Sequence, residues 1–111
     1  LPHCRDFGYP PFGRMVRIVL AHKGQSKVTA HAASLLRQIE AIAQRHTLPI
    51  RWHGPQPPPM ERLVELYRSE LILFADTAAP LQRLLAILRR QHALQHPQIN
   101  IAVDVDPVHM L

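Results

Sequence analysis

Cysteine is nearly absent from this chain of 111 residues, and long apolar runs are absent altogether. Cys4 is the single cysteine, so no disulfide can form within the chain, and a zinc site would lack a set of thiolate ligands. No apolar run approaches the roughly 20 residues that a membrane-spanning helix needs, and the N-terminus lacks the pattern of a secretory signal peptide. These absences argue against a disulfide-rich secreted domain and against a membrane protein.

The motifs of common enzyme classes are also missing. The sequence has no GxxxxGK[ST] phosphate loop, no GxGxxG and no GxSxG. Asp104 and Asp106 are two residues apart on a predicted strand, but no third acidic ligand for a divalent cation lies nearby. His92 and His96 have the spacing of two zinc ligands on a helix, yet Ala93 stands where HExxH requires glutamate. We therefore predict no catalytic centre and no metal site.

Positive charge and apolar residues are what the chain has in plenty. Thirteen Lys and Arg against eight Asp and Glu give a net charge of +5, which favours an anionic partner such as nucleic acid. Apolar residues make up 47% of the chain, enough for a hydrophobic core, and the length suits one domain. The sequence opens LPHCRDF without an initiator methionine, so we expect it to be a piece of a longer protein.

A stiff elbow is predicted at YPPFGRM, residues 9–15. Each proline restricts its own φ and pushes the residue before it toward an extended conformation. Gly13 then permits a bend that a side chain would resist. We expect residues 1–13 to form a linker and residues 14–111 to form the domain.

Hydrophobic periodicity predicts the first half of the domain. Apolar residues alternate over 14–22, which is typical of a strand. A helix is predicted from a cap at Ser26 to a point before Pro49. Its buried face has the four-three spacing of a helix and consists of Val28, Ala32, Leu35, Leu36, Ile39, Ile42 and Ala43. The proline-rich stretch IRWHGPQPPP, residues 50–59, is interpreted as a rigid polyproline-like connector.

The second half is predicted to contain strand, strand, helix, strand. The two successive strands cover 60–68 and 69–75. Asp76 or Thr77 is the expected cap of a helix that tolerates Pro80 in its first turn and ends before Pro97. Its inner stripe is Leu81, Leu84, Leu85 and Leu88, and the last strand points Ile99, Ile101, Val103 and Val105 inward. The order predicts an α/β (α+β) fold of split β-α-β-β-α-β type, with a four-stranded, mainly antiparallel sheet and both helices on one face.

This topology is shared by proteins of unrelated function. An RNA-recognition motif needs exposed aromatic residues on its two central strands, but the first predicted strand has none and the third has only Phe74. A small-molecule regulatory domain of the ACT type binds ligands at a glycine-bearing turn after the first strand, which Lys23-Gly24-Gln25 matches poorly. Scattered arginines remain, and guanidinium groups suit phosphate oxygens in a salt-sensitive, sequence-independent interaction.

Four segments in order resemble the C-terminal domain of the PriA family of replication-restart DNA helicases. They are YPPFGRM at 9–15, GPQPPPMERL at 54–63, YRSELIL at 67–73 and DVDPVHML at 104–111. The resemblance runs from about Tyr9 to Leu111 and implies a ribosomal S10-like fold entered by an elbow from the second helicase lobe. It also implies that the ATP, magnesium and zinc sites belong to other regions of the parent, so no cofactor is expected in this chain.

The resemblance implies a function as well. The parent is implied to be an ATP-dependent 3′ to 5′ DNA helicase that recognises abandoned forks and starts primosome reloading. The C-terminal domain is implied to bind single-stranded or forked DNA without catalysis of its own, and to help dock single-stranded DNA-binding protein. Other primosome proteins are further expected partners. The expected location is the bacterial cytoplasm, in association with the nucleoid and not with a membrane.

Particular residues follow from the charge and from the resemblance. We predict DNA contacts at Arg14, Arg17, Arg62, Tyr67 and Arg68, and partner contacts at Gln82 and Arg83. Val64 and Leu66 stand where the family often carries hairpin arginines, Glu65 replaces a turn glycine, and Ser69 replaces an aromatic residue. The alternative is therefore a protein-interaction module of a diverged PriA-like protein that has lost direct DNA contacts.

Overall fold

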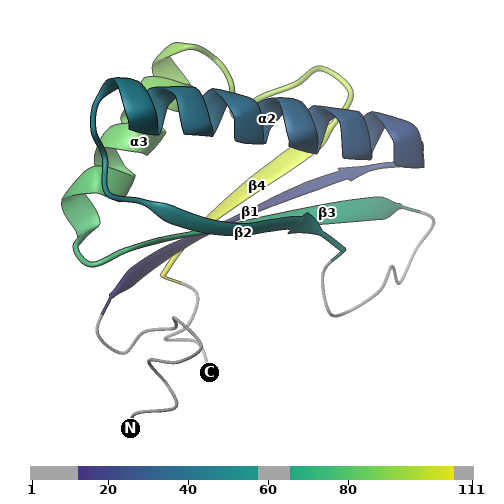
Figure 1. Ribbon diagram of the computed structural model, residues 1–111. Helices are drawn as coiled ribbons and strands as arrows, with labels where there is room; N and C mark the ends of the chain where they lie inside the picture. Colours follow the sequence, from purple (N-terminus) through teal and green to yellow (C-terminus); the bar gives the residue numbers. More distant parts are fainter. Residues whose placement is uncertain (1–12, 58–65, 107–111) are drawn as a thin grey trace, which may run out of the picture.

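The structure is a computed structural model that describes residues 13–57 and 66–106. The predicted order of elements is confirmed (Figure 1): β1 (Arg14–His22), α2 (Gln25–Arg45), β2 (Arg51–Gln56), β3 (Tyr67–Ala75), α3 (Ala78–Arg90) and β4 (Asn100–Val105). The predicted linker lies outside the described residues except for Gly13.

The strands form one antiparallel sheet in the order β2-β3-β1-β4. Both helices cover the same face of this sheet (Figure 1). The predicted α+β fold, with a four-stranded sheet and two helices on one face, is therefore confirmed. We call the opposite side of the sheet the open face. Side chains alternate along a strand, so Arg17 and Val19 of β1 lie on the open face while Ile18 points to the helices.

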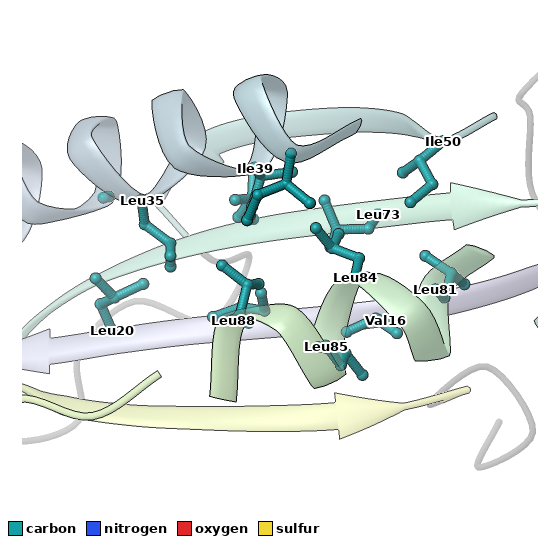
Figure 2. Close-up of a cluster of buried hydrophobic side chains, with 14 of the residues drawn as sticks. Val16, Leu20, Leu35, Ile39, Ile50, Leu73, Leu81, Leu84, Leu85 and Leu88 are labelled. Atoms are coloured by element: carbon teal, nitrogen blue, oxygen red, sulfur yellow. The ribbon is translucent and has the colours of Figure 1, made fainter. Parts of the chain in front are cut away.

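The core lies between the helices and the sheet, as the periodicity predicts. Leu84 and Leu88 of α3 are 0% exposed, and Figure 2 shows them among side chains of α2, β1 and β3. On α2 the predicted stripe is buried except for Leu36, which is partly buried against the core. Burying a leucine or isoleucine side chain contributes about 1.5–3 kcal/mol, so this layer of aliphatic side chains holds α2 and α3 in place.

The prediction for residues 50–59 was wrong over most of the stretch. Residues 51–56 form strand β2, which pairs with β3 from Arg51 opposite Phe74. The pairing register shifts between His53 and Gln56, around a cis Gly54–Pro55 peptide. Because β2 is an edge strand, one side of it needs no ladder partner, and proline is tolerated there. The strand predicted over 60–68 falls mostly outside the described residues, and its last two residues begin β3.

Three predicted details of the helices and of β4 also differ. Gly24, which has no side chain, is the N-cap of α2 in place of Ser26. Thr77 is the N-cap of α3, as one of the two predicted candidates, but its side chain makes no cap hydrogen bond within the described residues. Helix α3 ends at Arg90 instead of continuing toward Pro97. The chain turns there because His92 has a φ of 57°, which a helix cannot continue through. Val105 lies opposite the core residue Val16 and so points to the helix-covered face as predicted, but at the end of edge strand β4 it is 51% exposed.

Candidate nucleic-acid and partner surfaces

The predicted DNA-binding residues do not form one patch. Arg14 starts β1 opposite Ala75, whereas Arg68 lies opposite Ala21 at the other end of the same ladder. Seven residues of strand at about 3.3 Å each separate these ends by about 23 Å. Arg62 lies outside the described residues. The assignments remain predictions, and the structure shows what each described side chain contacts.

Arg14 is held by an acidic side chain of the same molecule. Its Nε donates to Asp106 Oδ2 at 2.7 Å, and a second guanidinium N–H donates to the same oxygen. The backbone N–H of Met15 donates to the other carboxylate oxygen at 3.0 Å. The hydrogen bond and the charge of Asp106 raise the pKa of Arg14 above its usual value. The Asp106 carboxylate thus acts as a clamp between the end of β4 and the start of β1.

The positive charge of Arg17 is neutralised by a carboxylate on the open face. Its Nε donates to Glu70 Oε1 at 2.5 Å, and the Glu70 side chain is only 4% exposed. Gln56 also donates to the second Glu70 oxygen, at 3.4 Å. Asp104 lies directly opposite Arg17 in the β1–β4 register, but the ion pair that Arg17 makes is with Glu70. The positive charge that the sequence places on β1 is therefore balanced within the sheet.

A third ion pair also involves an arginine of the sheet. Arg51 of β2 lies 3.8 Å from Asp76, with both side chains exposed. Within residues 13–57 and 66–106, every ion pair thus involves a cation of β1 or β2, and none involves α2 or α3. Uncompensated positive charge in this part of the molecule consequently lies mainly on the helices and their ends.

Tyr67 and Arg68 lie at the start of β3, beside α2. They line a hollow of about 430 Å³ together with Gln25, Val28, Thr29, Ala33, Pro55, Gln56, Pro57, Leu66 and Ser69. Tyr67 is 36% exposed, and Arg68 is half-buried. Of the four predicted DNA-contacting residues that the structure describes, these two line the same hollow.

Gln82 and Arg83 are consecutive in sequence but lie on different flanks of α3, as the 100° rotation per helical residue requires. Gln82 lines what we call the Gln82 hollow, of about 250 Å³. The other residues around it are Arg14, Met15, Val16, Ala78, Leu81, Leu85, Arg89, Val105 and Asp106. Arg83 instead lines a different hollow, together with His46, the C-cap residue of α2. The predicted partner-binding pair is therefore not one site, and Arg89, two turns after Gln82, supplies the cation on the Gln82 flank.

Arg83 belongs to a groove that the sequence did not predict. We define the α2–α3 groove as two hollows of about 280 Å³ each that share Gln91. The first is lined by His46, Arg83, Ala86, Ile87, Arg90 and Gln91, the second by Gln38, Ala41, Ile42, Arg45 and Gln91. No acidic side chain lines it among the described residues. The seven-residue spacing of Arg83 and Arg90 indicated one flank of a helix, but only the structure shows that Arg45 lines a second hollow joined to theirs through Gln91.

A histidine pair joins α2 to the segment before β4. The rings of His31 and His96 lie 4.8 Å apart at 70°. His96 Nδ1 accepts backbone N–H groups of Gln98 and Ile99 at 3.0 and 3.1 Å. His31 Nε2 is buried and has no hydrogen-bond partner among the residues that the structure describes. Burial, followed by the charge of His96, lowers the pKa of His31. The helix was predicted to continue toward Pro97 and so to carry both His92 and His96. Because α3 ends at Arg90, neither histidine lies on it.

No group of three His, Cys, Asp or Glu side chains comes together as a metal site in the parts that the structure describes. None of the helices described is both long enough and apolar enough to span a bilayer.

Solved structures share the fold at low sequence identity. A de novo designed protein, Foldit4, aligns with a TM-score of 0.56 and 15% identity over 84% of this chain and 94% of its own. A putative amidohydrolase/peptidase from Burkholderia cenocepacia has a TM-score of 0.52 and 14% identity over 84% of this chain. A putative aminohydrolase from methicillin-resistant Staphylococcus aureus has a TM-score of 0.52 and 9% identity over 85%. This chain spans only 27% and 28% of those two proteins, and such identities show the fold alone.

Sequence comparison identifies the family. A search of curated proteins found no match. Residues 5–108 match the family described as primosomal protein N C-terminal domain, PriA_C. This match covers nearly the whole chain and agrees with the resemblance carried by the four ordered segments. The chain therefore belongs to the family of primosomal protein N C-terminal domains.

Proposed function

We propose that this domain binds single-stranded or forked DNA and helps to dock single-stranded DNA-binding protein during replication restart, without catalysis of its own. One observation carries the proposal. In the described part of a basic chain, all ion pairs lie along the sheet, so the arginines of α2 and α3 keep their charge available for an external anion. Membership of a primosomal family supports DNA as that anion.

The Gln82 hollow is the proposed docking site for the acidic tail of single-stranded DNA-binding protein. Leu81, Leu85 and Val105 give it an apolar wall, and Gln82 and Arg89 supply an amide and a guanidinium on the same flank. Apolar contacts combined with a cation suit a peptide that carries both apolar and acidic side chains. In this proposal Arg89 takes the partner-binding role that the resemblance implied for Arg83.

The parent protein is proposed to be an ATP-dependent DNA helicase with its nucleotide, magnesium and zinc sites outside this chain. Other primosome proteins are proposed partners, and the bacterial cytoplasm and nucleoid the proposed location. The competing proposal is a protein-interaction module without direct DNA contacts. The internal pairing of Arg14 with Asp106 and of Arg17 with Glu70 favours that alternative, since paired guanidinium groups are less available to phosphate.

Two titrations separate these functions. Fluorescence anisotropy of the 111-residue chain with labelled single-stranded and forked DNA, at several salt concentrations, measures DNA binding. We expect affinity that falls steeply with salt, because phosphate contacts release counterions. A second titration uses the acidic tail peptide, with Gln82→Ala/Arg89→Gln as the variant. Peptide binding with no DNA binding at low salt would support the alternative, and absence of both would refute the proposal.

A further inference from the structure

We propose that the α2–α3 groove is the surface on which this domain holds the phosphodiester backbone of DNA. This inference rests on the proposed DNA-binding function and deepens it. It assigns the contact to Arg45, Arg83 and Arg90 on the helical layer, rather than to the sheet arginines and hairpin that the sequence predicted.

The guanidinium groups of the groove are available to a ligand. Arg45, Arg83 and Arg90 are exposed, and none of them forms an ion pair within the described residues. The acid on α2, Glu40, is five residues from Arg45, which places it about 140° around the helix from the groove. On the sheet, by contrast, Glu70 is buried beneath Arg17 and neutralises it. The groove therefore carries positive charge that no acid among residues 13–57 and 66–106 pairs with.

The chemistry of the groove favours a phosphate backbone over other anions. Arginine forks present two N–H groups that match phosphate oxygens, and the amides of Gln38 and Gln91 add neutral donors along the same path. An acidic peptide is usually held by an apolar anchor pocket, whereas the apolar side chains here are two alanines and two isoleucines at the base of an open groove. No Phe, Tyr or Trp side chain lines the groove among the described residues, and the imidazole of His46 is the single aromatic ring there, so the three arginines supply most of the contacts. Binding should consequently be independent of base sequence.

A matched pair of variants tests this assignment. The groove variant is Arg83→Gln/Arg90→Gln, and the control is Lys23→Gln/Arg51→Gln, which removes the same charge elsewhere from exposed positions. Far-UV circular dichroism establishes that both fold. The measurement is the slope of log affinity against log salt for a fluorescein-labelled oligothymidine and for a mixed-sequence strand of equal length.

For single strands each phosphate contact contributes a slope of about −0.7. Because the groove variant lacks two arginines, its slope should be less steep than that of the wild-type chain by about 1.4. Between about 50 and 200 mM salt, the wild-type chain should then lose about sevenfold more affinity than the variant does. The control should keep the wild-type slope, and both DNA sequences should behave alike.

The outcomes are distinguishable. Equal losses in the groove and control variants would refute the groove assignment and indicate a response to net charge alone. An unchanged groove variant would also refute it, while leaving DNA binding by the domain intact. If the groove variant loses the acidic tail peptide but keeps DNA, the groove is a peptide site and the inference is wrong. If the wild-type chain binds no DNA at low salt, the proposed function itself fails.

Discussion

The ion pair between Arg17 and Glu70 on the open face can be tested by measuring how much it contributes to the stability of the domain. Replacing Glu70 with Gln removes the carboxylate that Arg17 binds but keeps the size of the side chain. Breaking a fully buried ion pair costs about 3–5 kcal/mol, whereas an exposed pair contributes about 0–1 kcal/mol. The Glu70 side chain is 4% exposed and that of Arg17 is 33% exposed. Because Arg17 can reach water once released, we expect a loss of about 1–2 kcal/mol.

Urea unfolding followed by the fluorescence of Trp52, the single tryptophan, measures this loss. A double-mutant cycle with Glu70→Gln and Arg17→Gln isolates the coupling energy of the pair. Asp104→Asn is the control, since Asp104 lies opposite Arg17 but makes no ion pair with it in the part of the chain that the structure describes. This substitution should change stability by less than about 0.5 kcal/mol. A Glu70–Arg17 coupling below about 0.3 kcal/mol would refute the reasoning, because Arg17 would then be free to contact DNA.

Three further predictions concern the fold. Leu84→Ala should destabilise the domain by about 2–5 kcal/mol in thermal unfolding, because Leu84 is 0% exposed, while the exposed Gln44→Ala should change little. Gly54→Ala should lower the urea midpoint, because Gly54 has a φ of 100° and a Cβ there would lie 2.6 Å from a β3 carbonyl oxygen. Gly24→Ala should be tolerated, because the nearest atom to a Cβ at Gly24 belongs to a side chain and is 3.4 Å away. Burial lowers the pKa of His31 in the folded state, so the unfolded chain binds protons first. Stability should therefore fall as pH drops through about 6.5, and His31→Gln should flatten that dependence. A midpoint for Gly54→Ala equal to that of Gly24→Ala, or a pH profile unchanged by His31→Gln, would contradict the respective account.

Periodicity predicts the elements whose burial is set within one segment. The stripe from Val28 to Ala43 and the leucines of α3 fall where a 3.6-residue repeat places them, because each helix packs a single face on the sheet. The prediction of a polyproline connector failed at Arg51–Gln56 because the pairing of β2 with β3 outweighs local proline preference at a sheet edge.

Which arginines are paired with acids was less predictable, since the pairing depends on contacts between residues far apart in sequence. Arg14 pairs with a residue 92 positions away, and Arg17 with one 53 positions away. Nothing in the local pattern of β1 indicates these partners. The α2–α3 groove likewise requires the packing of two helices, because Arg45 and Arg83 come from different elements.

The most direct test of where DNA binds is a chemical-shift map. Titrating the ¹⁵N-labelled chain with a short single-stranded oligonucleotide identifies the amides whose surroundings change on binding. The account predicts that the largest shifts cluster at the C-terminal turns of α2 and along the α2-facing flank of α3, around Arg45, Arg83 and Arg90. Shifts concentrated instead on β1 and β3 around Arg17, with the helices unchanged, would contradict it.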